Sequence, residues 1–488
     1  MTMKRVIFLG LLLFVFAVPL RAQTDSIPSG AVWNLKQCID FALANSLTVK
    51  RSNYNVESSE VDLRQAKFSR LPSLNANASY GYSWGRGLDP VSNDFVSQEI
   101  TSSNVGAQAA LPLFNGLRIH NAIRQTQQFY AASQQDLLKT KNDLIINVAT
   151  LYINVVFNKE LVENARLQLA SSQQQLEQTS KQVRAGALPK AEQLNMDAQV
   201  ATNEVNLIQQ ENSLALSLLQ LKQALQIPDS QEFDVEVPAL EPEDLTLDQS
   251  RDEVYDIARQ IMPEIKSAAL KIESADYAVK ASRGNLYPRL SLVANLNTNY
   301  SSAQEAVFYP DGTFSSDAQP FATVGQDFEN VSTHVYRVVP GGTFRNTYGL
   351  SSQFKDNIYR TLGFQLTIPI FNNYTSRASY QRTIIDSQLA RVNAEETANT
   401  LRQNVETAYN NAVASSKTYN ASLRQVRARE EAFRINTQRR EIGAVNFLEY
   451  QVSENDLFRA KSDLLRAKYD FIFRKKVLDL YQGKPLEY

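Results

Sequence analysis

Histidine, cysteine and serine are the residues from which a catalytic or metal site could be built here, and their placement argues against one. The 488 residues include one cysteine, Cys38, and two histidines, His120 and His334. A catalytic triad needs a histidine beside its nucleophile, and a structural zinc site needs four cysteine or histidine ligands. The segment most similar to a nucleophile elbow, Gly81-Tyr-Ser-Trp-Gly85, lies in a strand pattern rather than a strand-to-helix turn. We expect no catalytic residue, no cofactor and no metal.

The N-terminus has the composition of a secretory signal peptide. Lys4 and Arg5 precede 13 apolar or small residues, and Ala22 follows at a suitable cleavage position. The alternative, a membrane-spanning helix, needs a longer apolar run. Removal of 1–22 deletes these two basic residues and Arg21, which takes the formal net charge from −1 to −4. This acidic balance argues against a nucleic-acid partner.

Four segments alternate apolar and polar residues with the period of a half-buried strand. They are 73–84, 104–114, 289–300 and 361–371. In the first, even positions from Leu74 to Trp84 are apolar and odd positions from Asn75 to Ser83 are polar or glycine. A tilted strand needs only about 9–11 residues to cross a bilayer, so these segments could span a membrane. Taken alone, one such segment fits an ordinary half-buried strand equally well.

Long helices are predicted between the strands because the chain has few breakers, with 17 Gly and 16 Pro among 488 residues. The expected helices are 32–70, 115–182, 188–226, 251–286, 373–440 and 445–481. Apolar residues recur at spacings of three and four along the two longest, which indicates coiled-coil packing. At 1.5 Å per residue, 115–182 would be about 100 Å long, more than most compact domains need.

The second half of the chain repeats the first. Three landmarks recur: Pro72 with Pro288, 216 residues apart, and Pro112 with Pro369 and Gly186 with Gly443, each 257 apart. The additional 41 residues therefore lie in the second hairpin's loop, about 301–359, which we expect to be long and exposed. The predicted divisions are a signal peptide 1–22, a first repeat 23–226, an acidic linker 227–250, a second repeat 251–482 and a tail 483–488.

Strand counting predicts an oligomer if the strands enter a membrane. Four strands cannot close a membrane barrel, because the smallest barrels have eight strands and an open edge cannot lie in lipid. Two copies would supply eight strands around an interior filled by side chains, whereas three would supply 12 strands and a lumen. The expected fold is mainly α with membrane β: long coiled-coil α-hairpins and four strands per subunit, forming a trimeric 12-strand β-barrel continued by a periplasmic α-helical cylinder.

This organisation resembles the TolC-type outer-membrane factor family of efflux and secretion channels over the whole mature chain. The resemblance rests on the two hairpin tips and on four junction motifs: Leu71-Pro72-Ser-Leu74, Tyr287-Pro288-Arg-Leu290, Leu111-Pro-Leu-Phe-Asn-Gly116 and Ile368-Pro-Ile-Phe-Asn-Asn373. The Gly-Arg-Gly-Leu-Asp-Pro loop at 85–90 is similar to the Bacteroides-type branch. The family implies a homotrimer in the cell outer membrane, in contact with its lipid, with helices projecting into the periplasm.

The resemblance also implies the function and the partners. The channel would be a passive conduit from periplasm to exterior in a tripartite efflux or type I secretion system. A periplasmic adaptor (membrane fusion) protein and an inner-membrane pump of the RND or ABC type would open it at its periplasmic tip. The residues at these tips are Gly186, Ala187, Leu188, Gly443, Ala444 and Val445. Turn formation, which requires the glycines in any case, is the alternative role for them.

Carboxylates that narrow the periplasmic mouth follow the second tip's glycine in the family. Glu449 stands six residues after Gly443, and Glu192 stands six after Gly186. The family's pattern has a second acid three residues further on, where this chain has Val452. A ring of Glu449 side chains would favour cations. The alternative is a solvated glutamate in the first turn of a helix, which the helix dipole favours.

A soluble periplasmic coiled-coil binding or adaptor protein without a membrane barrel is the second functional hypothesis. Long helices rich in Gln and Asn would fit it. The four alternating strands, with proline at corresponding junctions of both halves, favour the channel, because a soluble coiled coil needs neither.

Overall fold

The computed structural model describes residues 32–88, 95–97, 99–228, 230–238, 249–304, 306–316, 322–326, 332–335, 338–346 and 348–484. The predicted signal peptide, nearly half of the predicted acidic linker and most of the predicted tail lie outside these residues. The chain divides into two compact units. The first is made of three separate segments of the chain and the second of two.

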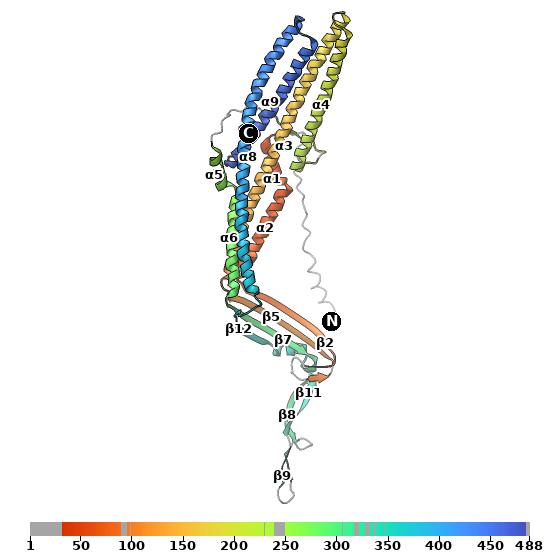
Figure 1. Ribbon diagram of the computed structural model, residues 1–488. Helices are drawn as coiled ribbons and strands as arrows, with labels where there is room; N and C mark the ends of the chain where they lie inside the picture. The colour runs from red at the N-terminus through yellow and green to blue at the C-terminus, as the bar shows by residue number, and fades with distance from the viewer. Residues whose placement is uncertain are drawn as a thin grey trace, which may run out of the picture. The chain divides into compact units, whose positions relative to one another are not determined.

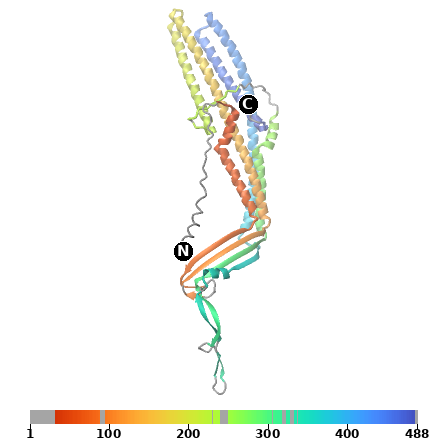
Figure 2. The same cartoon turned by 180° about the vertical axis from the view of Figure 1, so that it is seen from behind.

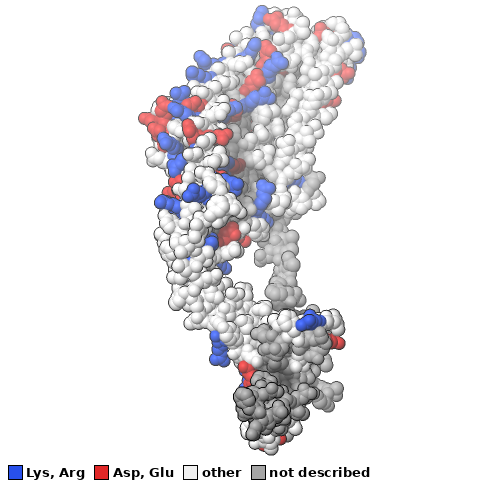
Figure 3. Space-filling view, turned by 60° about the horizontal axis from the view of Figure 1, so that its bottom comes forward, with Lys and Arg blue, Asp and Glu red and all other residues white. Residues whose placement is uncertain are grey.

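The first unit consists of the described residues of Met1–Ser52, Leu138–Met262 and Thr400–Tyr488. It contains the parts of two helical hairpins that include their turns, and these hairpins lie side by side in Figures 1 and 2. The hairpins are α3 (Arg118–Arg184) with α4 (Lys190–Leu225), and α8 (Thr375–Glu441) with α9 (Phe447–Tyr481). Acidic and basic side chains are interspersed along the helices on the face seen in Figure 3.

An aromatic core holds the first unit together. Strand β1 (Val32–Trp33) pairs in parallel with β6 (Asp234–Val235), which lies in the predicted linker. The Trp33 ring packs edge-on against Phe233, with 5.3 Å between centroids. Cys38 is fully buried in this core, and burial raises the pKa of its thiol to about 12. One stretch of α3 is long and apolar enough to span a membrane, but buried α3 side chains such as Val148, Val155 and Val156 lie in this core.

The second unit consists of the described residues of Asn53–Leu137 and of Pro263–Asn399. Its centre is an antiparallel sheet with the strand order β12-β7-β5-β2. The strands are β2 (Ser73–Ser83), β5 (Ile100–Phe114), β7 (Arg289–Ser301) and β12 (Tyr359–Thr367). Helix α6 (Pro263–Arg283) contacts α8 through Asp276. The Asp276 carboxylate accepts a hydrogen bond from Ser387 at 2.6 Å and forms an ion pair with Arg391 at 2.7 Å. The hydrogen bond from Ser387 is the main reason that the pKa of Asp276 is lowered.

Two predicted helices are interrupted in the structure. The segment 32–70 forms β1, α1 (Leu35–Asn45) and α2 (Leu47–Phe68), and 251–286 forms α5 (Arg251–Ile261), α6 and a 3-10 turn, η1 (Gly284–Leu286). Both α1 and α5 begin with a capping box, at Asn34 and Ser250. The break after α5 falls at Met262, because a residue before proline disfavours the helical conformation.

The predicted long loop 301–359 contains regular structure. Strand β8 (Ala306–Ser316) pairs with β11 (Val338–Asn346), β9 (Ala322–Gln326) pairs with β10 (Ser332–Val335), and α7 (Leu350–Asp356) follows. In the first hairpin's loop, β3 (Arg86–Leu88) pairs with β4 (Phe95–Ser97). Serine, threonine and glycine are common both in loops and in exposed strands. The composition of 301–359 therefore could not distinguish an irregular loop from paired strands.

The internal repeat extends to backbone conformation. Residues in the left-handed region recur 257 positions apart: Gly116 and Asn373, Leu117 and Tyr374, Gly186 and Gly443, and Gln226 and Gly483. The two capping boxes are 216 residues apart, and α3 and α8 each have 67 residues. Corresponding turns of the two halves therefore need the same unusual backbone geometry, even where the side chain differs.

Candidate functional site

The four-stranded sheet has one apolar and one polar face. Strand register places apolar residues in one row across all four strands: Leu74, Ala109, Ala294 and Leu362. The adjacent row, on the opposite face, is polar: Asn75, Gln108, Asn295 and Thr361. The Asn295 amide donates a hydrogen bond to the Thr361 hydroxyl, with 3.1 Å between the atoms. The alternation predicted for single strands is thus in phase across the whole sheet.

Much of the apolar face is exposed in the part of the single chain that the structure describes. Leu362, Phe364 and Tyr80 are 73, 72 and 63% exposed. At the loop end of β2, the rings of Tyr80, Tyr82 and Trp84 follow one another, with 5.5 and 6.4 Å between successive centroids. A sheet in water would bury such a face, whereas a bilayer would cover it and would accept the aromatic rings at its interface.

The polar face carries amides and hydroxyls through the middle of the sheet. Gly106 lies between Asn77 and Asn297 in the strand register. A Cβ atom at Gly106 would collide with the Asn297 amide and lie 3.1 Å from Asn77 Oδ1. Glycine at this position leaves room for the two asparagine side chains that lie over its backbone. This face can donate and accept hydrogen bonds, as the wall of a water-filled space must.

The predicted junction prolines do not occupy equivalent positions. Pro72 and Pro288 stand directly before β2 and β7, and Pro369 follows the end of β12. Pro112, in contrast, lies inside β5, next to a register shift before Phe114. Proline has no N–H to donate to a ladder, so an irregularity of pairing is expected beside it. Pro112 thus lies inside the observed strand, as it lies inside the predicted strand 104–114.

The first hairpin tip is a glycine-centred turn. Gly186 has φ +75°, and Ala187 donates its N–H to the Gln182 carbonyl, 2.9 Å away. Gly186 and Ala187 are exposed, whereas Leu188 is half-buried. Glu192 lies in the first turn of α4, and its Oε2 atom is buried without a hydrogen-bond partner in the part of the chain that the structure describes.

The second tip repeats this turn and adds a side-chain cap. Gly443 has φ +71°, and Ala444 donates to the Arg439 carbonyl at 2.8 Å. Both residues are exposed, and Val445 is half-buried. The Asn446 side chain accepts a hydrogen bond from the Glu449 N–H at 2.8 Å, which starts α9.

The Glu449 carboxylate has a cationic neighbour that sequence reasoning missed. One Arg439 guanidinium nitrogen lies 3.9 Å from Glu449 Oε1, and these side chains are 50 and 53% exposed. Val452, one turn further along α9, is 51% exposed. The last turn of α8 is rich in arginine, and that charge was the available signal for this pair. Glu449 is therefore a solvated carboxylate whose charge is partly offset.

Comparison with known proteins assigns the family. Residues 38–225 and 254–481 match the family described as "Outer membrane efflux protein". The chain belongs to this family. The two matched segments correspond to the two halves of the internal repeat.

Relatives and solved structures agree with this assignment. The efflux protein is 22% identical to the outer membrane protein TolC of Escherichia coli K12 over 450 residues, 91% of this chain and 80% of that protein. It is 26% identical to the solvent efflux pump outer membrane protein SrpC of Pseudomonas putida, over 60% of each chain. The solved structure of CusC has a TM-score of 0.72 at 19% identity, and each chain is covered to 92%. For VceC of Vibrio cholerae the TM-score is 0.70 at 15% identity, covering 93% of this chain and 97% of that one.

The efflux protein is thus an outer-membrane channel protein of efflux systems. The predictions of the family, of a mainly helical fold with an internal duplication, of an efflux channel and of the outer membrane are confirmed. The trimer and its barrel stay predictions. The relatives are channel proteins rather than enzymes, and none supports the soluble coiled-coil alternative.

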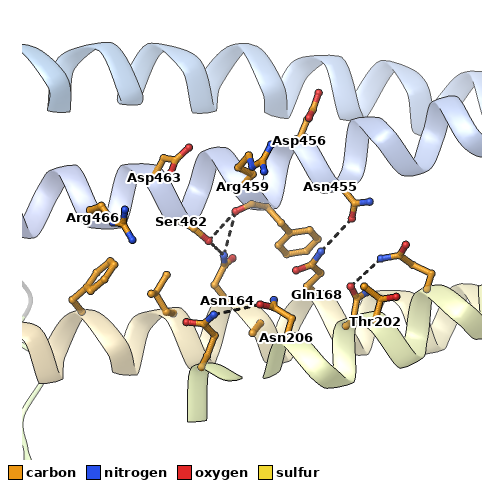
Figure 4. Close-up of a pocket in the computed structure, with 17 residues that line it drawn as sticks. Asn164, Gln168, Thr202, Asn206, Asn455, Asp456, Arg459, Ser462, Asp463 and Arg466 are labelled. Carbon is orange, nitrogen blue, oxygen red and sulfur yellow. Dashed lines mark hydrogen bonds between the residues drawn. The ribbon is translucent and has the colours of Figure 1, made fainter. Parts of the chain in front are cut away.

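Polar side chains join the two hairpins of the efflux protein, which sequence reasoning also missed. Figure 4 shows Asn164 of α3 donating to Ser462 Oγ of α9, at 2.8 Å, beside a groove of about 640 Å³ that α4 also lines. Nearer the tips, the buried Glu454 carboxylate accepts hydrogen bonds from Ser171 at 2.6 Å and from Gln175 at 2.8 Å. Asn158 and Ser172 interrupt the apolar spacing of α3, and these two residues were the sequence signal for polar packing on this helix.

Proposed function

We propose that three copies of this chain close one 12-stranded β-barrel and form a passive conduit from the periplasm to the exterior. The single observation that carries the proposal is the two-faced sheet. One face carries an apolar row that crosses all four strands and is exposed at Leu74 and Leu362, and the other carries a row of uncharged amides and hydroxyls. Within the part of the chain that the structure describes, the sheet is open at β2 and β12, and an open edge is not tolerated in lipid.

The polar face would line the lumen and the apolar face would contact lipid. Amides and hydroxyls hydrate readily but add no fixed charge, so the middle of this wall would pass solutes of either sign, whereas Arg289, opposite Thr367, adds a positive charge at the end of the strand. The Tyr80, Tyr82 and Trp84 rings would lie at one membrane interface. The helices would project into the periplasm, where the tips would meet other proteins of an efflux or type I secretion system.

The tip residues are the proposed contact with a periplasmic adaptor and, through it, with an inner-membrane pump of the RND or ABC type. Gly186, Ala187, Gly443 and Ala444 are exposed and present little side chain, so a helical hairpin could approach closely. Leu188 and Val445 would contribute apolar contact from half-buried positions. Loss of cross-linking between an adaptor and cysteines introduced at these tips would contradict this contact.

We place Glu449, with Glu192, at the periplasmic aperture. Three Glu449 side chains would favour cations, but each lies near Arg439. The wild-type aperture should therefore be weakly cation-selective, and Glu449→Ala should lower its selectivity or alter its conductance. Unchanged conductance and selectivity in Glu449→Ala would remove this residue from the aperture.

Thiol labelling of neighbouring β7 residues tests the proposed channel. Asn297 and Leu296 are adjacent but lie on opposite faces of the sheet. In planar lipid bilayers, a charged water-soluble thiol reagent should reduce the conductance of Asn297→Cys channels and leave Leu296→Cys channels unchanged. Absence of channels from the wild-type protein, or block of Leu296→Cys alone, would contradict the proposal.

A further inference from the structure

The sheet of one chain ends at two strands, β2 and β12, whose outer edges pair with no other strand among the described residues. We propose that β12 of one copy pairs with β2 of the next in one defined antiparallel register, with Gln365 opposite Ser79. This inference rests on the proposed function, because it names the residues through which copies of the chain would join.

The internal repeat supplies a rule for strand register that the structure obeys. In the first hairpin, Ser73 lies opposite Ala110. The repeat offsets of 216 and 257 residues carry these two to Arg289 and Thr367. Arg289 and Thr367 lie opposite each other in the second hairpin. The two hairpins thus have the same register to the residue, although their loops differ in length and structure.

The same rule converts the contact between hairpins into a contact between copies. Within one chain, β5 of the first hairpin pairs with β7 of the second, and Gln108 lies opposite Asn295. The strands that correspond to β5 and β7 are β12 and β2, the two open edges. Applying 257 forward and 216 backward carries Gln108 to Gln365 and Asn295 to Ser79. The next copy would therefore repeat, at the open edge, the pairing that already joins the two halves.

The chemistry of the resulting pairs is consistent on both faces. On the apolar face, Phe364 would face Tyr80, and Leu362 would face Tyr82. These four side chains are 72, 63, 73 and 53% exposed in the single chain. On the polar face, the opposite pairs would be Gln365 with Ser79, Thr367 with Asn77, and Thr361 with Ser83.

Slippage by one residue would destroy this match. Phe364 would then stand opposite Ser79, and one strand would turn its apolar side chains to the polar face. Slippage by two residues keeps each residue on its face, so only the repeat distinguishes that register from the proposed one. The experiment must therefore separate registers that differ by two residues.

Disulfide cross-linking of the double variant Ser79→Cys/Gln365→Cys tests the register. In one chain, β5 and β7 separate these residues, which puts the two strands about 14 Å apart, beyond the reach of a disulfide. A bond therefore joins two copies, and a closed ring of three copies should yield covalent trimers on a denaturing gel without reductant. The native Cys38 is buried and should contribute no cross-link.

Two matched controls carry the same Ser79→Cys change with a cysteine two residues away on the same face, at Gly363 or Thr367. Diagonal positions lie about 7–8 Å apart, so each control should cross-link at least about fivefold less. More cross-linking in either control than in the Gln365 variant would overturn the register. Trimers without cross-linking in any of the three variants would overturn β12–β2 pairing itself. A protein that is monomeric before oxidation would instead overturn the proposed function.

Discussion

Replacement of Gln353 by leucine should release helix α7 from the edge of β7. Gln353 is fully buried, and its side-chain amide contacts the backbone of Ser301 twice. The Ser301 N–H donates to Gln353 Oε1 and Gln353 Nε2 donates to the Ser301 carbonyl, both at 2.9 Å. Gln353 Nε2 also donates to the Tyr348 carbonyl at 2.9 Å. Strand β12 begins at Tyr359, opposite Asn297, so this amide serves the stretch of β7 beyond the reach of β12.

The size of the effect follows from these contacts. Leucine has nearly the same volume but cannot donate or accept a hydrogen bond, so two buried backbone groups of Ser301 lose this partner. Each such loss costs about 1–3 kcal/mol, so we expect a total of about 2–6 kcal/mol for local opening. That free energy corresponds to an increase of roughly 30- to 20,000-fold in the local opening equilibrium.

Hydrogen–deuterium exchange of the peptide that covers 299–304 measures this opening. Exchange at the Ser301 amide should accelerate by the factor above in Gln353→Leu, while the amides in the middle of β7 keep their protection. The control is Ser351→Leu, which adds the same side chain at an exposed position of α7. Exchange within twofold of wild type in Gln353→Leu would refute the role of this amide as a β-edge mimic.

Three further predictions concern other parts of the fold. Gly116→Ala should lower the yield of folded protein in the membrane, because φ is +61° and the new Cβ would lie 2.7 Å from the Gly284 carbonyl; normal yield would contradict this. The pKa of Asp276 is lowered in the folded protein, so its ionised carboxylate stabilises the α6–α8 contact above the unfolded pKa, and this stabilisation is lost on acidification. Hydrogen exchange at this contact should therefore rise below about pH 4, and it should rise less in Asp276→Asn. Arg439→Ala should make the channel more cation-selective in planar bilayers, because it removes the positive charge beside Glu449; a reversal potential equal to wild type would place this pair outside the conduction path.

Periodic features of this chain could be predicted from sequence because they depend on local chemistry. The alternation from Leu74 to Trp84 reports a two-faced strand wherever its partners lie, and the strand is observed as Ser73–Ser83. The repeat followed from spacing alone, through Pro72 with Pro288 and Gly186 with Gly443. Interruptions of helices were missed, because a serine at 46 ends α1 as a cap, and its effect depends on neighbouring residues rather than on periodicity.

Long-range contacts could not be predicted from these patterns. Arg439 lies near Glu449 only because the tip folds α9 back beside α8. The buried amide of Gln353 finds Ser301, 52 residues away, only after α7 has formed on the edge of β7. Similarly, Glu454 and Ser171 meet between the two hairpins although they are 283 residues apart. In each case a polar residue resembles a solvated one until the tertiary structure supplies its partner.

Native mass spectrometry of the protein extracted from outer membranes in detergent tests the central claim most directly. Three copies closing one barrel predict a complex with the mass of three chains, which persists at protein concentrations too low for chance association. The same preparation should form channels in planar bilayers. A monomer, a dimer or a water-soluble species that leaves the membrane without detergent would contradict the shared barrel.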